Sequence, residues 1–333
     1  MNPKTLSTDP HSAVQATMQG EEPIHVSQPS DTGRAEWEAV SAWPVRLGRG
    51  VVREANFFLQ VIRRDLSSTV FPGLLFSAAA WNSSKAPVTE LVPTLLRSLL
   101  YFSFFVFTFC LSNQIVGVEE DRINKPDRPL ARGLVSIRGA WIRWALAMVL
   151  YTFIGWKLDV LVWTLLWQAV TLIHNLAGGA RNWFIKDLSM GVGVFVQLRA
   201  GWLLGAPMTE AANTWILFLA VAIFVLVPVQ DLRDIDGDRL SRRKTFPMVF
   251  GVKTTRMFLA VGFTVLIGIS HALLTSLMPL TPLVLACDIA LGLVSLAIAL
   301  RVMLLRSAQA DHSTYLLFTY WFCLAMVSGV VGL

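Results

Sequence analysis

Charged residues are scarce in this sequence. Asp, Glu, Lys and Arg make up 15% of its 333 residues, whereas hydrophobic residues make up 54% and the mean hydropathy is +0.57. A soluble domain normally carries about 25% charged residues. The scarcity therefore excludes an ordinary soluble globular protein and indicates a protein of the lipid bilayer.

Cysteine is also rare. The three cysteines, Cys110, Cys287 and Cys323, all lie in apolar segments, and no two of them have Cys-x-x-Cys spacing. This pattern argues against a disulfide framework or a cysteine metal site, and it indicates buried, inert thiols.

Residues 1–50 lack a periodic apolar pattern and are rich in Ser, Thr, Pro, Gln and Glu. They contain the acids Asp9, Glu21 and Glu22, and their first arginine is Arg34. This composition resembles neither a secretory signal nor an organellar transit peptide, and it predicts a disordered segment. The first membrane helix would then serve as the insertion signal.

Long apolar runs dominate the remainder of the chain. They cover about residues 68–84, 92–117, 139–156, 159–177, 188–205, 213–230, 256–277, 280–305 and 313–332. Several reach the roughly 20 residues that span a bilayer, and the shorter ones suit an embedded bundle. The sequence therefore predicts an all-α membrane protein with about nine transmembrane helices.

Residues 51–66 precede the first of these runs and begin the predicted membrane domain, 51–333. Apolar residues alternate here with Arg53, Arg63, Arg64 and Asp65. The mixture predicts either an amphipathic helix at the membrane interface or a simple membrane anchor.

The basic residues are distributed unevenly among the loops. With the N-terminal region placed in the cytoplasm, sixteen Lys and Arg residues fall on that side and only Lys85, Arg97 and Lys157 on the other. The positive-inside rule then places both polar segments described below on the cytoplasmic face of an endoplasmic reticulum or other endomembrane. The net charge of +6 reflects this topology and an attraction for anionic lipid or substrate, and nothing points to nucleic acid.

The first polar segment, Asn113 to Gly133, reads NQIVGVEEDRINKPDRPLARG and follows an apolar run. Helical spacing places five residues of this segment on a common face, whereas Glu119 points away. The five residues are Asn113, Gly117, Glu120, Asp121 and Asn124. Carboxylate and amide oxygens suit Mg²⁺, which also bridges to phosphate oxygens. Three bases follow, Lys125, Arg128 and Arg132, and they are positioned to meet the charge of a diphosphate. The alternative interpretation is ordinary juxtamembrane charge.

The second polar segment, Asp231 to Lys244, reads DLRDIDGDRLSRRK. Asp231, Asp234 and Asp238 have spacings that place them on one helical face, whereas Asp236 projects elsewhere. Three carboxylates so close together would repel unless cations intervene, so the spacing predicts metal binding. Bases flank this site at Arg239, Arg242, Arg243 and Lys244.

Three further polar residues interrupt apolar runs. His174 either bonds a neighbouring helix or takes part in catalysis. Lys186 lies at the cytoplasmic start of the next helix and is a candidate for binding diphosphate. Arg199 would cost roughly 2.5–3.5 kcal/mol in mid-helix, so it should face the bundle interior in a structural or catalytic role.

Aromatic residues are concentrated in the run over residues 92–117, as Tyr101, Phe102, Phe104, Phe105, Phe107 and Phe109. Most are expected to face lipid or the packed core. A minority could line a pocket and stabilise a carbocation, because a desolvated cation–π contact is worth about 2 kcal/mol or more. Tyr315, Tyr320 and Trp321 are either pocket liners or interface aromatics.

Over about residues 55–333 the sequence resembles the UbiA superfamily of intramembrane prenyltransferases. Its members carry an Asn-Asp-x-x-Asp-x-x-x-Asp first motif and an Asp-rich second motif, and GDRLSRRKTFPMVFG resembles the segment after the second. Asn113 and Asp121 match the first motif, whereas Gln114 and Gly117 depart from it and Glu120 would compensate. The pattern NQxxGxxEDxxNKPDRP is similar to that of the fungal UbiA-type terpene cyclases.

The resemblance implies a class I terpene cyclase, which ionises a linear isoprenyl diphosphate and cyclises the cation in an apolar pocket that excludes water. A twenty-carbon substrate is favoured over farnesyl diphosphate. Mg²⁺ would be held by Asn113, Glu120, Asp121, Asp231, Asp234 and Asp238, all catalytic except Glu120. The substrate would be bound by Lys125, Arg128, Lys186, Arg239 and Arg199.

Two alternative functions remain open. An aromatic prenyltransferase would use the same ionisation and a bound aromatic acceptor as nucleophile. A transporter for an anionic solute would use midplane charges and discontinuous helices. The polar clusters here lie at helix ends on one side, which favours an enzyme. No obligate protein partner is evident.

Overall fold

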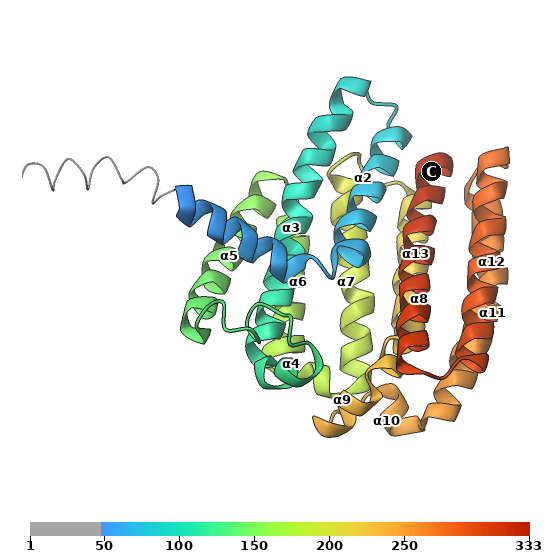
Figure 1. Cartoon of the computed structure of the whole chain (residues 1–333). Helices are drawn as coiled ribbons and strands as arrows, with labels where there is room; N and C mark the ends of the chain where they lie inside the picture. Colours follow the sequence, from blue (N-terminus) through green and yellow to red (C-terminus); the bar gives the residue numbers. More distant parts are fainter. Residues whose placement is uncertain (1–47) are drawn as a thin grey trace, which may run out of the picture. The chain divides into compact units, whose positions relative to one another are not determined.

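Helices make up the regular structure of the part that the computed structural model describes, residues 48–333. The predicted disordered segment therefore lies outside the described residues, except for residues 48–50, which belong to a helix over residues 48–62. Residues 54–333 form one compact unit, shown in Figure 1.

The longer helices follow one another along the chain. They are α2 (Phe71–Ser83), α3 (Leu91–Val116), α5 (Ile137–Lys157), α6 (Leu161–Thr171), α7 (Trp183–Leu203), α8 (Glu210–Leu226), α11 (Val252–Leu277), α12 (Pro282–Leu304) and α13 (Ala308–Gly332). Short segments join or extend them. These are the π-helices η1 (Leu66–Val70) and η3 (Leu172–Leu176), the 3-10 segments η2 (Val88–Glu90), η4 (Gly179–Arg181), η5 (Val227–Val229) and η6 (Asp231–Arg233), and the helices α4 (Val118–Asn124), α9 (Ile235–Leu240) and α10 (Phe246–Phe250).

Within residues 48–333, six helical stretches are long and apolar enough to cross a membrane. They contain α3, α5, α8, α11, α12 and α13. Each predicted apolar run coincides with a helix, but the predicted nine spans are not confirmed. Helices α2 and α6 are short, and α7 carries Lys186, Asp187 and Arg199.

Apolar side chains cover the outer surfaces of several long helices at intervals of three or four residues, which is one side of a helix. In a water-soluble protein such a surface would be an aggregation hazard, whereas in a bilayer it meets acyl chains of equal polarity. The exposed residues include Ile142, Leu146, Val149 and Phe153 on α5, Val261, Val265 and Ile269 on α11, and Leu285, Ile289 and Leu293 on α12.

Helix α7 lies inside the bundle, in contact with α2, α6 and α8, and α13 packs on both α2 and α12. The α2–α7 contact is close because small residues face each other. A Cβ on Gly201 would lie 3.4 Å from the Gly73 carbonyl oxygen, and one on Gly205 would lie 2.8 Å from that of Ser77. The Ser77 hydroxyl donates to the Gly201 carbonyl at 2.8 Å, so a hydrogen bond from a side chain of α2 to the backbone of α7 joins the two helices where they approach.

Side-chain caps define where several helices begin. Asn182 accepts from the backbone N–H groups of Phe184 and Ile185 at the start of α7, and Thr281 accepts from Val284 before α12. Thr209 and Ser307 cap α8 and α13 in the same way. Such caps satisfy N–H groups that have no partner within the helix. Helices α4, α9 and α10, which carry or adjoin the polar segments, lie at one end of the bundle (Figure 1).

A buried ion pair ties the same ends of α11, α12 and α13 together. Arg256 of α11 contacts Asp311 of α13 at 2.7 Å, and it also donates to the carbonyls of Val302 at 2.8 Å and Leu305 at 3.1 Å. Both charged side chains are less than 10% exposed, at 8% and 3%. The ion pair therefore joins these helices in the protein interior and is not part of a solvated surface.

We expect Asp311→Ala to destabilise the protein by about 3–5 kcal/mol, because it leaves the Arg256 guanidinium buried without its counter-ion. The measurement is the unfolding temperature of the purified protein in detergent. The control is Glu90→Ala, which removes an exposed partner 3.9 Å from Arg97 and should cost about 1 kcal/mol or less. Equal unfolding temperatures for the two variants would contradict this structural role of the Arg256–Asp311 ion pair.

Candidate functional site

The two polar segments line one cavity of about 670 Å³ at the end of the bundle. The first segment contributes Asn113, Glu120, Lys125 and Arg128, and α7 contributes Lys186. From the second segment come Arg233, Asp234, Asp236, Asp238 and Arg243. The structure therefore brings together residues that are more than 100 positions apart in the sequence. This space is called the polar cavity below.

A direct ion pair joins the two segments. Arg243 donates to Glu120 at 2.6 Å, across 123 positions of sequence, and both side chains are about one quarter exposed. Glu119, by contrast, is 78% exposed and pairs with Arg122 on its own helix at 2.7 Å. The face predicted for the first segment therefore separates Glu120 from Glu119 correctly.

Asp121 lies behind the cavity wall and holds one of the bases that line it. It is 4% exposed and contacts Arg128 at 2.7 Å. Arg128 also donates to the Asn113 side-chain oxygen at 3.3 Å, and Asn113 donates to Asn175 at 3.2 Å. The guanidinium is thus fixed from two sides and presented to the cavity.

Asp231 holds Lys186 in the same manner. Its side chain is 1% exposed and accepts a hydrogen bond from the Lys186 ammonium. Asp238 is also buried and accepts from the Thr245 hydroxyl at 2.9 Å. Asp234, which is 34% exposed, contacts the neighbouring Arg233 at 3.3 Å. Of the predicted trio, Asp234 and Asp238 line the cavity and Asp231 stands behind it.

The second segment does not form the single helix that its spacing predicts. Helix α8 ends at Leu226, two 3-10 turns follow, and α9 begins only at Ile235. Pro228 lacks a backbone N–H and so cannot continue the α-helical hydrogen bonding. Asp231 and Asp234 are consequently placed by tight turns, and Asp238 by a separate short helix.

The oxygen donors of the polar cavity fit Mg²⁺ bound together with a diphosphate. Within the described part of the chain, no three His, Cys, Asp or Glu side chains are close enough to hold one ion by themselves. Asn113, Glu120, Asp234 and Asp238 nevertheless present hard oxygens, and one buried carboxylate oxygen of Asp231 accepts no hydrogen bond from any residue of 48–333. Mg²⁺ normally takes one or two carboxylates and completes its shell with water and phosphate oxygens.

Burial and neighbouring charge perturb the groups at this end of the bundle. Burial and the adjacent Arg128 lower the pKa of the Lys125 ammonium. Although burial opposes it, the Asp121 carboxylate raises the pKa of Arg128. Burial raises the pKa of Asp238. Bases held close together and partly desolvated would gain from an anion bound among them.

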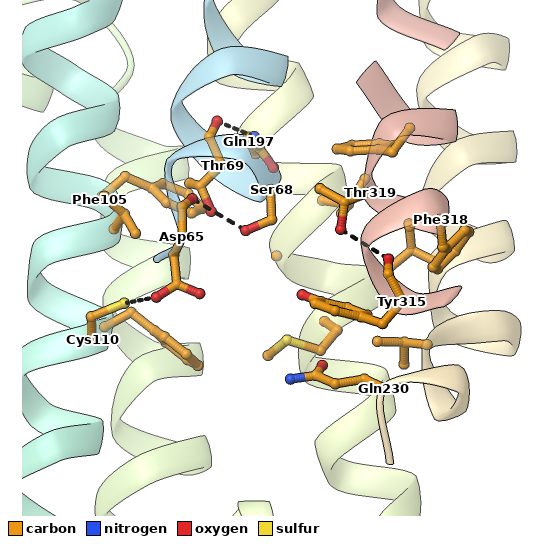
Figure 2. Close-up of a pocket in the computed structure, with 18 of the residues that line it drawn as sticks. Asp65, Ser68, Thr69, Phe105, Cys110, Gln197, Gln230, Tyr315, Phe318 and Thr319 are labelled. Carbon is orange, nitrogen blue, oxygen red and sulfur yellow. Dashed lines mark hydrogen bonds between the residues drawn. The ribbon is translucent and has the colours of Figure 1, made fainter. Parts of the chain in front are cut away.

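A second, apolar cavity of about 180 Å³ adjoins the polar one, and Figure 2 shows its lining. Six residues line both spaces: Asp65, Phe109, Cys110, Met190, Gln230 and Tyr315. Of the six aromatic residues singled out in α3, only Phe105 and Phe109 line this cavity. Both stack on Trp167, with ring centroids 4.2 and 5.1 Å away. Figure 2 also shows the Tyr315 ring reaching into the cavity, whereas Trp321 is buried in the core and Tyr320 is exposed.

Two predicted substrate-binding residues lie away from both cavities. Arg239 is 66% exposed and contacts Asp236 at 3.4 Å. Arg199 is near the opposite end of α7, where it donates to Asn213 at 2.5 Å and stacks on the Trp163 and Phe195 rings. This set of contacts supplies the partner that a membrane arginine requires.

The sequence predicts no definite role for several residues that line the cavities. His174, for which the sequence leaves a catalytic role open, lines the polar cavity, and its buried Nδ1 has no hydrogen-bond partner among the described residues. Asp65, Cys110, Trp167 and Gln230 line one or both cavities but were not assigned a role. The only signal for Asp65 was an acid beside two arginines at the edge of an apolar run.

The fold and the site define an α-helical membrane protein with a charge-lined cavity that opens onto an apolar one. The sequence matches the UbiA prenyltransferase family over residues 68–323, and the chain belongs to that family. It is 41% identical to somaliensene A/B synthase of Streptomyces somaliensis, a match that covers 86% of this chain and 95% of the relative. It is 34% identical to the diterpene cyclase eriG of Hericium erinaceus, over 83% of this chain and 88% of that protein.

A third relative is named as a transferase rather than as a synthase or cyclase. The polyprenyl transferase eriF of Hericium erinaceus is 30% identical, over 83% of this chain and 94% of that protein. Among solved structures, a UbiA homologue from Archaeoglobus fulgidus bound to GPP and Mg²⁺ matches with a TM-score of 0.59 and 15% identity, over 82% of this chain and 99% of that one. The structural likeness confirms the all-α fold.

Proposed function

We propose that this chain is a membrane-bound terpene cyclase that ionises a linear isoprenyl diphosphate with Mg²⁺ and cyclises the resulting cation. The observation that carries the proposal is the junction of the two cavities through six shared residues. A diphosphate can lie among the charges of the polar cavity while its hydrocarbon enters the apolar one. An amphipathic substrate of this kind matches both spaces at once.

The bases of the polar cavity bind and orient the diphosphate. Lys125, Arg128, Lys186, Arg233 and Arg243 all line it. Asp121 and Asp231 fix Arg128 and Lys186 from behind, so these cations are already in place when the substrate arrives. Charges that need no reorganisation stabilise a developing anion more effectively than mobile ones.

Mg²⁺ bound at Asn113, Glu120, Asp234 and Asp238 would supply further positive charge to the departing diphosphate. Asp121 and Asp231 stay in the proposed ligand set as acids that would offer an oxygen to the ion while they hold their bases. Arg239 and Arg199 would act from outside the cavities, on the approach of the substrate and on the packing of α7.

The apolar cavity orients the hydrocarbon and keeps water away from the cation. Phe105, Phe109 and Trp167 form a stacked aromatic wall, and Trp167 is fixed by a hydrogen bond from its ring N–H to the Phe105 carbonyl at 2.9 Å. A cation over such a desolvated face gains about 2 kcal/mol. The relatives named as a somaliensene synthase and a diterpene cyclase support cyclisation, with a twenty-carbon substrate favoured.

An aromatic prenyltransferase is the second candidate, because one relative of similar coverage is named a polyprenyl transferase. It would use the same polar cavity and ionisation but would require an aromatic acceptor. We further propose that the polar cavity opens to the cytoplasm, as the distribution of basic residues favours, from a membrane such as that of the endoplasmic reticulum.

The test incubates membranes containing the protein with Mg²⁺ and farnesyl or geranylgeranyl diphosphate, without an acceptor. We expect a cyclic hydrocarbon in the extract by gas chromatography and mass spectrometry, and none after EDTA removes the metal. Empty membranes are the control. A product that forms only when a phenolic acceptor is added would establish the prenyltransferase instead, and absence of any diphosphate release would overturn both enzymes.

A further inference from the structure

We propose that Asp65 is the base that ends the cyclisation by removing a proton from the cyclised cation. The inference rests on the proposed cyclase function. Asp65 lies where the two cavities meet, and it lines both of them. It immediately precedes the π-helix η1 and is separate from both acidic segments.

The contacts of Asp65 leave one carboxylate oxygen available. Its Oδ2 accepts from the Cys110 thiol at 3.2 Å, and its backbone carbonyl accepts from the Ser68 hydroxyl at 3.2 Å. Among the described residues, no hydrogen bond joins a side chain to Oδ1. Figure 2 shows the carboxylate held beside Cys110, with the hydroxyl end of Tyr315 directed across the cavity toward it. The side chain is therefore oriented, and its free oxygen is not engaged elsewhere.

Asp65 differs from the other acids of the site in having no basic partner. Glu120, Asp121, Asp231, Asp234 and Asp238 each form an ion pair. Two bases that line the polar cavity together with Asp65 already have partners, because Arg64 contacts Asp127 at 2.5 Å and Arg128 contacts Asp121 at 2.7 Å. In residues 48–333 the Asp65 carboxylate forms no ion pair. Asp65 thus presents a carboxylate without an ion-pair partner, among the described residues, to a largely apolar space.

The Asp65 carboxylate would contribute to the reaction only while a cation occupies the apolar cavity. A carboxylate beside an apolar cavity has little to stabilise it in the resting protein, whereas a carbocation in the cavity would be attracted to it. A carboxylate at this position would stabilise the cyclised cation, which forms in the apolar cavity after the diphosphate has left. The same group is then correctly placed to accept the proton that the cation must lose.

A C–H bond next to the cationic carbon breaks, its electron pair forms the new C=C bond, and the proton passes to the free Asp65 oxygen. The carboxylic acid then returns the proton through the polar cavity, to solvent or to the released diphosphate. Cys110 is a positioning residue in this scheme because it holds the other oxygen. The released diphosphate is the competing base, and the test must separate the two.

The experiment measures diphosphate release and hydrocarbon products in parallel for Asp65→Asn. We expect release to stay within about tenfold of the natural protein, because the bases and acids of the polar cavity are intact. The natural hydrocarbon should fall to less than about one tenth of the products, replaced by alkenes with shifted double bonds and by alcohols from water capture. Asp65→Glu, which keeps the carboxylate, should restore part of the natural product.

Glu119→Gln is the matched control, since it makes the same acid-to-amide change at an exposed position and should leave release and products unchanged. Cys110→Ala should broaden the products, because it frees the Asp65 oxygen that the thiol holds. Size-exclusion chromatography of each variant in detergent verifies the fold, and the Glu variant tests the idea if the Asn variant does not fold.

An unchanged product profile in Asp65→Asn would overturn the inference and leave the diphosphate as the base. Loss of diphosphate release together with the product would also overturn it, by placing Asp65 in ionisation. If the natural protein releases no diphosphate, the proposed function fails first, and this result is distinguishable from both others.

Discussion

We expect Asp121→Ala and Asp234→Ala each to abolish turnover of the isoprenyl diphosphate while expression in the membrane stays normal. Asp121 holds Arg128 at 2.7 Å against the cavity, and Asp234 presents its oxygens to the same space. Removal of one preorganised charge from a site of this kind typically costs about 10²- to 10³-fold in rate. The measurement is diphosphate release by purified protein at saturating Mg²⁺ and substrate.

Glu119→Ala is the control for these two variants. Glu119 lies two positions before Asp121 on the same short helix, but its side chain is 78% exposed and faces away from the cavity. We expect its turnover to match that of the natural protein. Near-normal release by either aspartate variant would remove that residue from the site, whatever the result for the other.

The two variants should also differ in their response to Mg²⁺. If Asp234 is a metal ligand, excess Mg²⁺ should partly restore turnover in a conservative Asp234→Asn variant. If Asp121 acts by holding Arg128, excess Mg²⁺ should not restore Asp121→Asn, because the displaced group is a protein cation. This comparison separates ligation from positioning.

The helical architecture was predictable because the apolar runs are long and closely match helices of the structure. The residues at which the helices begin were less predictable, because side-chain caps rather than hydropathy define them. Asn182 caps α7, so that helix begins at Trp183, before the apolar run expected from residue 188. Lys186 and Asp187 therefore lie in its first two turns, and Lys186 is directed toward Asp231.

Sequence spacing identified acids and bases of the site but not their partners. The Glu120–Arg243 and Lys186–Asp231 pairs join segments 123 and 45 positions apart, and no periodicity reports such a contact. Spacing also cannot distinguish an acid that lines a cavity from one that stands behind it and holds a base. Asp234 and Asp231 differ in this way although they are three residues apart.

The paired acids suggest how the site can remain folded before substrate binds. Five acids of the two segments each contact a base, so their mutual repulsion is offset without an ion. On binding of Mg²⁺ and diphosphate, the acids that line the cavity, Glu120, Asp234 and Asp238, would turn to the metal, while Asp121 and Asp231 keep Arg128 and Lys186 in place for the phosphates.

We expect Lys186→Met to abolish turnover and also to destabilise the protein by about 3–5 kcal/mol, because it leaves the Asp231 carboxylate buried without its partner. Lys186 and Asp231 are only 14% and 1% exposed, so solvent cannot replace the lost contact. The measurements are diphosphate release and the unfolding temperature in detergent.

The double variant Lys186→Met/Asp231→Leu separates the two effects. Replacement of both charges by apolar side chains removes the uncompensated charge, so the unfolding temperature should return toward that of the natural protein. Turnover should remain absent, since the cation that we propose binds the diphosphate is still missing. A double variant no more stable than Lys186→Met would contradict the pairing, and one that regained turnover would show that Lys186 serves the fold alone.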